Sequence, residues 1–119
     1  MNKLVKLFIT SISAITLALV SFTSSFAKVE GEYIVLGSAI SLTGKYSSNG
    51  VHTQNGYNMA VERINKMGGV EVQGKKYKFE IIYYDDESNP KRAAQLAERL
   101  IKQDGVHYML GPYSSGLTK

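Results

Sequence analysis

The chain has 119 residues, with 14 Lys and Arg, 10 Asp and Glu and no cysteine, so its formal net charge at pH 7 is +4. The absence of cysteine excludes a disulfide framework, a thiolate nucleophile and a cysteine-ligated metal site. The positive charge is too small and too scattered to indicate a nucleic-acid surface, so no nucleic-acid partner is expected.

The first 27 residues have the pattern of a secretory signal peptide. Two lysines precede a mostly apolar run over residues 7–20, and the small residues Ser25 and Ala27 stand three and one before the expected cleavage point. A membrane anchor is the alternative, but the run is shorter than the roughly 20 apolar residues of a membrane span. We expect residues 1–27 to be removed after Ala27, which leaves residues 28–119 as an exported mature chain.

The mature part begins with a strand and a helix. Residues 33–40 are apolar and rich in β-formers and predict a first strand, and residues 41–50 predict a polar loop. Apolar residues then recur at helical spacing over 51–67, and the pair Gly68-Gly69 predicts a left-handed helix end. A short edge piece is predicted over 70–73. The apolar positions of the helix are Tyr57, Ala60, Val61, Ile64 and Met67.

A second strand, a second helix and a third strand follow. Aromatic and β-branched residues over 77–84 predict the strand. Asn89 and Pro90 then provide an N-cap and a proline at the first helical position, and Gly105 predicts the end of this helix. Residues 106–110 predict the third strand. The helix is expected to bury the stripe Ala93, Leu96, Ala97, Leu100 and Ile101.

This alternation predicts an α/β fold with a parallel βαβαβ sheet. Right-handed crossovers and the flavodoxin-like strand order 2-1-3 place the first strand in the middle and the two helices on opposite faces. Ligands of such sheets bind at the carboxyl ends of the strands beside the point where the order reverses. Those ends are the loop over 41–50 and the turn over 112–116.

The turn after the third strand is the first candidate for ligand contact. Ser114, Ser115 and Gly116 stand where a new helix would begin, and the free N–H groups of a helix start attract a carboxylate. Simple N-capping by the serines is the alternative, and both uses draw on the same N–H groups. Tyr46 lies in the loop over 41–50 and Tyr113 in the turn over 112–116, which together are called the two mouth loops. An apolar wall beside a ligand and ordinary packing within the loops are both open interpretations of these rings.

Metal binding, phosphoryl transfer and catalysis have little support in the sequence. The cluster Asp85-Asp86-Glu87 has the composition of a Mg²⁺ or phosphoryl site, but a solvated turn ahead of a helix is the favoured interpretation. His52 and His107 lie too far apart in the pattern to indicate a metal pair. No nucleophile, base and acid can be assembled into a catalytic set, so we expect no enzyme activity, no metal and no cofactor.

Five motifs follow one another in fixed order after the expected signal peptide. They are Gly37-Ser38-Ala39-Ile40-Ser41-Leu42-Thr43-Gly44, Gly56-Tyr57-Asn58-Met59-Ala60, Ile64-Asn65-Lys66-Met67-Gly68-Gly69-Val70, Tyr84-Asp85-Asp86-Glu87-Ser88-Asn89-Pro90 and Gly111-Pro112-Tyr113-Ser114-Ser115. In this order and spacing they resemble the start of a branched-chain amino acid (leucine/isoleucine/valine) binding protein of the type 1 periplasmic binding protein family of ABC importers. The resemblance covers essentially the whole mature chain.

The resemblance implies a periplasmic protein of two α/β lobes with the ligand between them, of which residues 28–119 would supply an incomplete amino-terminal lobe. It implies an amino acid ligand, branched-chain or related, and an ABC transporter membrane permease as partner. Ser115 would hold the α-carboxylate with Ser114 and Gly116 beside it, and Tyr46 and Asn49 would lie near the side-chain wall. The alternative is a ligand-sensing receptor or regulator lobe of the same fold that binds an amide, urea or aromatic acid.

Overall fold

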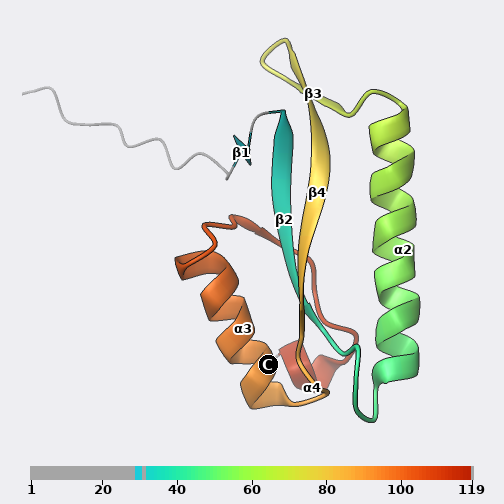
Figure 1. Ribbon diagram of the computed structural model, residues 1–119, viewed down its shortest axis with the longest axis vertical. Coiled ribbons are helices and arrows are strands. Elements are labelled where there is room, and N and C mark those ends of the chain that lie inside the picture. Colours follow the sequence, from blue (N-terminus) through green and yellow to red (C-terminus); the bar gives the residue numbers. More distant parts are fainter. Residues whose placement is uncertain (1–28, 31, 119) are drawn as a thin grey trace, which may run out of the picture.

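The computed structural model describes residues 29–30 and 32–118, which form a five-stranded mixed sheet with helices on both faces (Figure 1). The expected signal peptide lies outside these residues. In the described part of the chain, no helix is long and apolar enough to span a membrane. The elements are β1 (Val29–Glu30), β2 (Tyr33–Ile40), α2 (Ser47–Lys66), β3 (Val70–Val72), β4 (Lys75–Asp85), α3 (Pro90–Lys102), β5 (Tyr108–Met109) and α4 (Ser115–Thr118).

Strand β2 lies at the centre of the sheet, as the sequence predicts. It pairs in parallel with β4 along its whole length, from Tyr33 to Ile40, and in parallel with β5 at Leu36 and Gly37. Two antiparallel additions extend the predicted order: β1 pairs with the start of β2, and β3 pairs with the start of β4. The α/β fold class is therefore confirmed, with a sheet that is mixed rather than purely parallel.

Helix α2 begins at Ser47, about one turn before the predicted start, so residues 47–50 are helical rather than part of the loop. The reason lies at Gly50, which is buried against the preceding loop. A Cβ there would lie 1.8 Å from the Ser41 carbonyl oxygen. Because only glycine permits this approach, the polar residues of the first turn can close onto the end of β2.

Strand β5 is shorter than predicted, because only Tyr108 and Met109 pair with β2. The Val106 N–H donates instead to the Leu100 carbonyl, 2.9 Å away, and so remains attached to the end of α3. Its side chain is buried in the core. The apolar character of Val106 thus reflects burial rather than strand pairing.

The ends of the long helices follow the sequence signals. Gly68 and Gly69 have φ of 96° and 84°, and Gly105 has φ of 69°, as left-handed helix ends require. Asn89 caps α3 by accepting a hydrogen bond from the Arg92 N–H at 3.1 Å, and Pro90 takes the first helical position.

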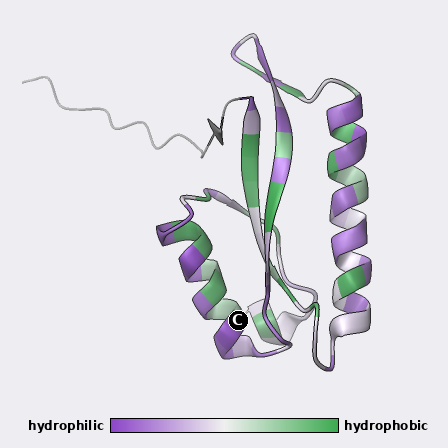
Figure 2. Cartoon of the chain, in the orientation of Figure 1, coloured by the Kyte–Doolittle hydropathy of each residue, from purple (hydrophilic) through white to green (hydrophobic). Residues whose placement is uncertain are grey.

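The best-packed part of the core lies between α3 and the sheet. Val35, Leu100 and Val106 are buried together, with Ile82 and Tyr84 packed against them. Figure 2 shows apolar segments along β2 and along α3, where they alternate with hydrophilic ones. The predicted stripe is correct for Ala93, Leu96 and Leu100, which are buried, but wrong for Ile101, which is 54% exposed.

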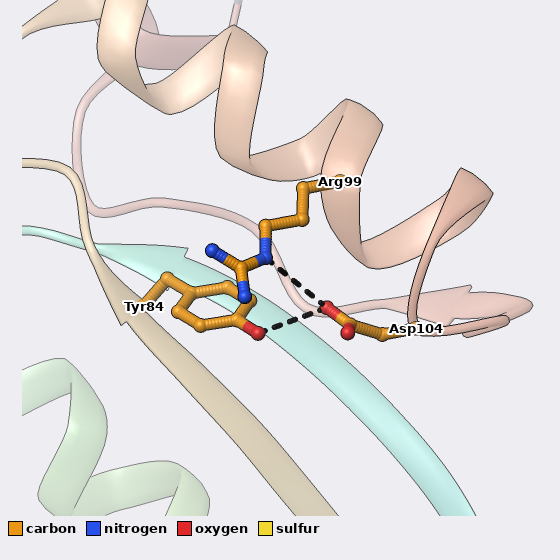
Figure 3. Close-up of polar contacts among 3 residues, drawn as sticks. All are labelled: Tyr84, Arg99 and Asp104. Carbon is orange, nitrogen blue, oxygen red and sulfur yellow. Dashed lines mark hydrogen bonds and ion pairs between the residues drawn. The ribbon is translucent and has the colours of Figure 1, made fainter.

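A polar contact fastens the end of α3 to β4 (Figure 3). The Tyr84 hydroxyl donates to Asp104 Oδ2 at 3.0 Å, and the Arg99 guanidinium lies 4.7 Å from the centre of the Tyr84 ring. Arg99 Nε is 4.0 Å from the same carboxylate oxygen. This cluster fixes the helix orientation on the face that carries the buried core.

Helix α2 lies on the opposite face of the sheet (Figure 1). Asn65 holds it to the edge of β4, because its amide both donates to and accepts from the Phe79 backbone at 2.8 Å. An apolar groove of about 570 Å³ remains between α2 and the sheet, lined by side chains that include Leu36, Ile64 and Tyr108. The last position of the predicted apolar face, Met67, is 67% exposed.

Candidate functional site

The candidate site lies at the carboxyl edge of the parallel strands, where three connections meet. The loop after β2, the turn after β4 and the start of α4 lie at one end of the molecule, opposite the β3–β4 hairpin (Figure 1). The register explains this, because Ile40 at the end of β2 lies beside Asp85 at the end of β4. On the other side of β2, the Leu110 N–H donates to the Gly37 carbonyl at 2.8 Å and directs the following turn to the same end.

Tyr46 and Tyr113 come from the two predicted mouth loops and contact each other. Their ring centroids are 6.1 Å apart, with the planes inclined at 54°. The Lys45 ammonium lies 4.7 Å from the centre of the Tyr46 ring. Lys45, and after it the Ser114 hydroxyl, lower the pKa of the Tyr46 phenol below its ordinary value. The fold therefore joins the aromatic residues of both loops to the serine-rich turn.

The two serines of the turn have different positions. Ser114 caps α4: its hydroxyl accepts from the Gly116 N–H at 3.2 Å, and its carbonyl accepts from the Leu117 N–H at 2.9 Å. The buried side chain of Leu117 anchors the turn to the core. Ser115 is exposed, and its hydroxyl has no hydrogen-bond partner within residues 32–118. Ser115 is consequently the serine that remains available to a ligand.

Asn49 lies in the first turn of α2, not in a loop as predicted. Its side chain is exposed, and its carbonyl accepts a hydrogen bond from the Thr53 hydroxyl at 2.9 Å. The helix start thus brings Asn49 to the same end of the molecule as Tyr46, which directly precedes α2.

Asp85 organises the loop after β2, a role that sequence reasoning missed. Its Oδ1 accepts from the N–H groups of Leu42 and Thr43, at 2.9 and 3.2 Å, and from that of Glu87 at 2.9 Å. Its Oδ2 accepts from the Thr43 hydroxyl at 2.7 Å. Partial burial acts to raise the pKa of Asp85, but the hydrogen bonds from Thr43, Glu87 and Leu42 outweigh it and keep the pKa below its ordinary value.

The prediction of a solvated acidic turn is wrong for Asp86, which has no exposed surface. Its Oδ1 accepts from the Ser41 hydroxyl at 2.6 Å and from the Ser88 N–H at 2.8 Å. A signal for these contacts was present, because neighbouring parallel strands end together and the acidic turn must then face the loop after β2. Within residues 29–30 and 32–118, no group of three His, Cys, Asp or Glu side chains could hold a metal ion.

Comparison with known proteins agrees with this architecture. Residues 34–119 match the family described as periplasmic binding protein. The chain belongs to the periplasmic binding protein family. Members of this family are solute-binding proteins, and several relatives of this chain carry the name Leu/Ile/Val-binding protein.

Three similar proteins illustrate the relationship. The Leu/Ile/Val-binding protein BraC3 of Rhizobium johnstonii is 33% identical over 93 residues, which are 78% of this chain and 24% of that protein. The substrate-binding protein LivJ of Streptococcus pneumoniae, solved with isoleucine, is 31% identical with a TM-score of 0.63, over 71% of this chain and 23% of LivJ. A type 1 periplasmic binding protein of Bordetella pertussis is 32% identical with a TM-score of 0.59, over 71% and 22%.

These matches cover only part of each relative. The chain spans about a quarter of the length of the curated relatives that it matches.

Proposed function

We propose that this chain is part of an extracytoplasmic solute-binding protein that binds an amino acid, branched-chain or related, and delivers it to the membrane permease of an ABC importer. Binding and release involve no covalent chemistry. The names of the relatives support an amino acid ligand, and the leader pattern of residues 1–27 supports export to the periplasm. In the whole protein, two lobes would close on the ligand and present the closed form to the permease.

The observation that carries this proposal is the convergence of a serine-rich helix start with an aromatic pair. Ser115 offers an exposed hydroxyl at the first residue of α4, next to the Tyr46–Tyr113 contact. A carboxylate accepts hydrogen bonds from a hydroxyl and from the backbone N–H groups of such a turn. The tyrosine rings supply an apolar surface for the carbon skeleton beside it.

In the full-length protein, Ser115→Ala should weaken the binding of leucine, isoleucine and valine by a similar factor. One hydrogen bond to a charged group contributes roughly 1.5–3 kcal/mol, which corresponds to about a ten- to hundredfold loss of affinity. Selectivity should hardly change, because all three ligands share the carboxylate. Isothermal titration calorimetry with the three amino acids measures both quantities.

Ser114→Ala is the matched control, because Ser114 caps α4. Without ligand, Ser114→Ala should lose about 0.5–2 kcal/mol of unfolding free energy, as N-cap removal does, and Ser115→Ala should lose much less. If Ser115→Ala binds all three amino acids as tightly as the wild type does, the assignment of Ser115 to the carboxylate is wrong.

A further inference from the structure

Ser88 lies beneath the loop that carries Tyr46. The residue is 9% exposed, and its hydroxyl makes two hydrogen bonds to that loop. Ser88 Oγ donates to the Thr43 carbonyl at 2.7 Å and accepts from the Tyr46 N–H at 3.0 Å. One hydroxyl therefore joins two points of the loop after β2 to the turn after β4.

The two segments are in close contact at this point. Gly44 has φ of 81°, and a Cβ on Gly44 would lie 2.7 Å from both the Ser88 hydroxyl and the Glu87 carbonyl oxygen. The loop can approach the turn this closely only because position 44 has no side chain.

The turn itself has an unfavourable backbone conformation. Glu87 and Ser88 have φ of 56° and 60°, values that L-residues with a Cβ rarely adopt. The carboxylates of Asp85 and Asp86 hold it, because they accept the N–H groups of Glu87 and Ser88 at 2.9 and 2.8 Å. Backbone strain of this kind persists where the surrounding contacts over-determine it, and it concentrates at functional sites.

The loop that Ser88 holds leads directly to the candidate ligand site. Tyr46, whose N–H bonds to Ser88, contacts Tyr113 with its ring, and Tyr113 is two residues before Ser115. The position of the aromatic pair relative to Ser115 thus depends on how firmly the Tyr46 backbone is held.

We propose that Ser88 is a positioning residue for the amino acid site, because its hydroxyl fixes the loop after β2 and thereby holds Tyr46 against Tyr113 beside Ser115. This inference rests on the proposed function. Ser88 acts through Tyr46 and makes no contact with the ligand itself.

The sharpest test replaces Ser88 with glycine in the full-length protein. Ser88→Gly removes the hydroxyl but suits the positive φ, so the fold should retain its stability. The affinity for leucine, isoleucine and valine should fall about tenfold, as expected for the loss of two neutral hydrogen bonds that order the site. Ser88→Ala also lacks the hydroxyl and should lose as much affinity, although its Cβ keeps the backbone strain.

Glu87→Gly is the matched control, because it relaxes the neighbouring positive φ and removes only an exposed side chain. Its N–H to Asp85 is retained, so its affinity should stay within about twofold of the wild type. Melting temperatures of all variants without ligand show whether a loss of affinity occurs in a folded protein.

A spectroscopic readout separates positioning from general stability. In protein labelled with ¹³C at the tyrosine ring, the Tyr46 resonance should shift in Ser88→Gly, and the pKa of its phenol should return toward the ordinary value as the ring leaves Lys45 and Ser114. Glu87→Gly should change neither. Wild-type affinity in Ser88→Gly, or an unmoved Tyr46 resonance, would overturn the inference and leave the proposed function intact. A wild-type protein that binds none of the three amino acids would overturn both.

Discussion

Asp85 shows how a single side chain can shape a loop, here the loop after β2. Its carboxylate only accepts hydrogen bonds, and its oxygens face N–H and O–H donors from Leu42, Thr43 and Glu87. An amide at this position would direct an NH₂ group at some of these donors. The loop therefore needs two acceptor oxygens at this position, which an ionised carboxylate provides.

We expect Asp85→Asn to lower the unfolding free energy of the full-length protein by about 1.5–3 kcal/mol at pH 7, the usual range for hydrogen bonds to a charged group. Because the pKa of Asp85 is lowered in the folded state, this stabilisation is fully present above the unfolded pKa, roughly 3.9, and is lost as the pH falls through the folded pKa. Urea unfolding from pH 7 to pH 3 should show the difference between wild type and variant shrinking at the acid end.

Glu87→Gln is the control for this pH series, because the Glu87 side chain is exposed. The unfolding free energy of Glu87→Gln should match that of the wild type at every pH. If the unfolding free energy of Asp85→Asn stays below that of the wild type by the same amount down to pH 3, the carboxylate charge is not the source of the stabilisation.

Helix α2 shows how two glycines in one element can have opposite roles. Gly50 lies against the Ser41 carbonyl, whereas a Cβ at Gly56 would meet no atom within 4 Å. The first glycine is required by packing, and the second only weakens the helix.

Gly50→Ala should destabilise the full-length protein by about 1–3 kcal/mol, because the added methyl group displaces the helix start from the loop after β2. Gly56→Ala should stabilise it by about 0.5–1 kcal/mol through helix propensity. Chemical denaturation measures the change in unfolding free energy for each variant. Two changes of the same sign would contradict the role assigned to Gly50.

For the molecule as a whole, the two faces of the sheet differ in how well they are covered. Helix α3 buries Leu100 and its neighbours against one face, whereas the α2 face retains the apolar groove of about 570 Å³. Tyr108, which lines this groove, is 57% exposed. Contiguous apolar surface of this kind favours association.

We expect residues 28–119, produced alone, to be marginally stable and to self-associate at micromolar concentration through this groove. Tyr108→Lys should reduce the association, because it places a charge in the groove. Met59→Lys, at a residue that is 69% exposed outside the groove, should not. Sedimentation velocity over a concentration series measures this, and a segment that stays monomeric throughout would contradict the expectation.

The sequence by itself determined the features that local chemistry controls. Hydrophobic periodicity predicted the order of strands and helices. Gly68, Gly69 and Gly105 marked the helix ends, and Asn89 and Pro90 marked the start of α3. Topological rules then predicted that the loop after β2 and the turn after β5 lie at the same edge of the sheet, as the structure has them. The ligand roles of Ser115, Ser114, Gly116, Tyr46, Asn49 and Tyr113 remain predictions.

Only the tertiary structure decided the features that depend on contacts between residues that are not neighbours in the sequence. The contact between Ser41 and Gly50 moved the start of α2, and pairing limited to Leu36 and Gly37 shortened β5. The contact of Ser41 with Asp86, and that of Tyr46 with Ser88, formed when β2 and β4 ended side by side. Helix and strand propensities act over a few neighbouring residues, whereas burial and long-range hydrogen bonds are set by the packed chain, so no local pattern could show that Asp86 is buried beneath the loop after β2.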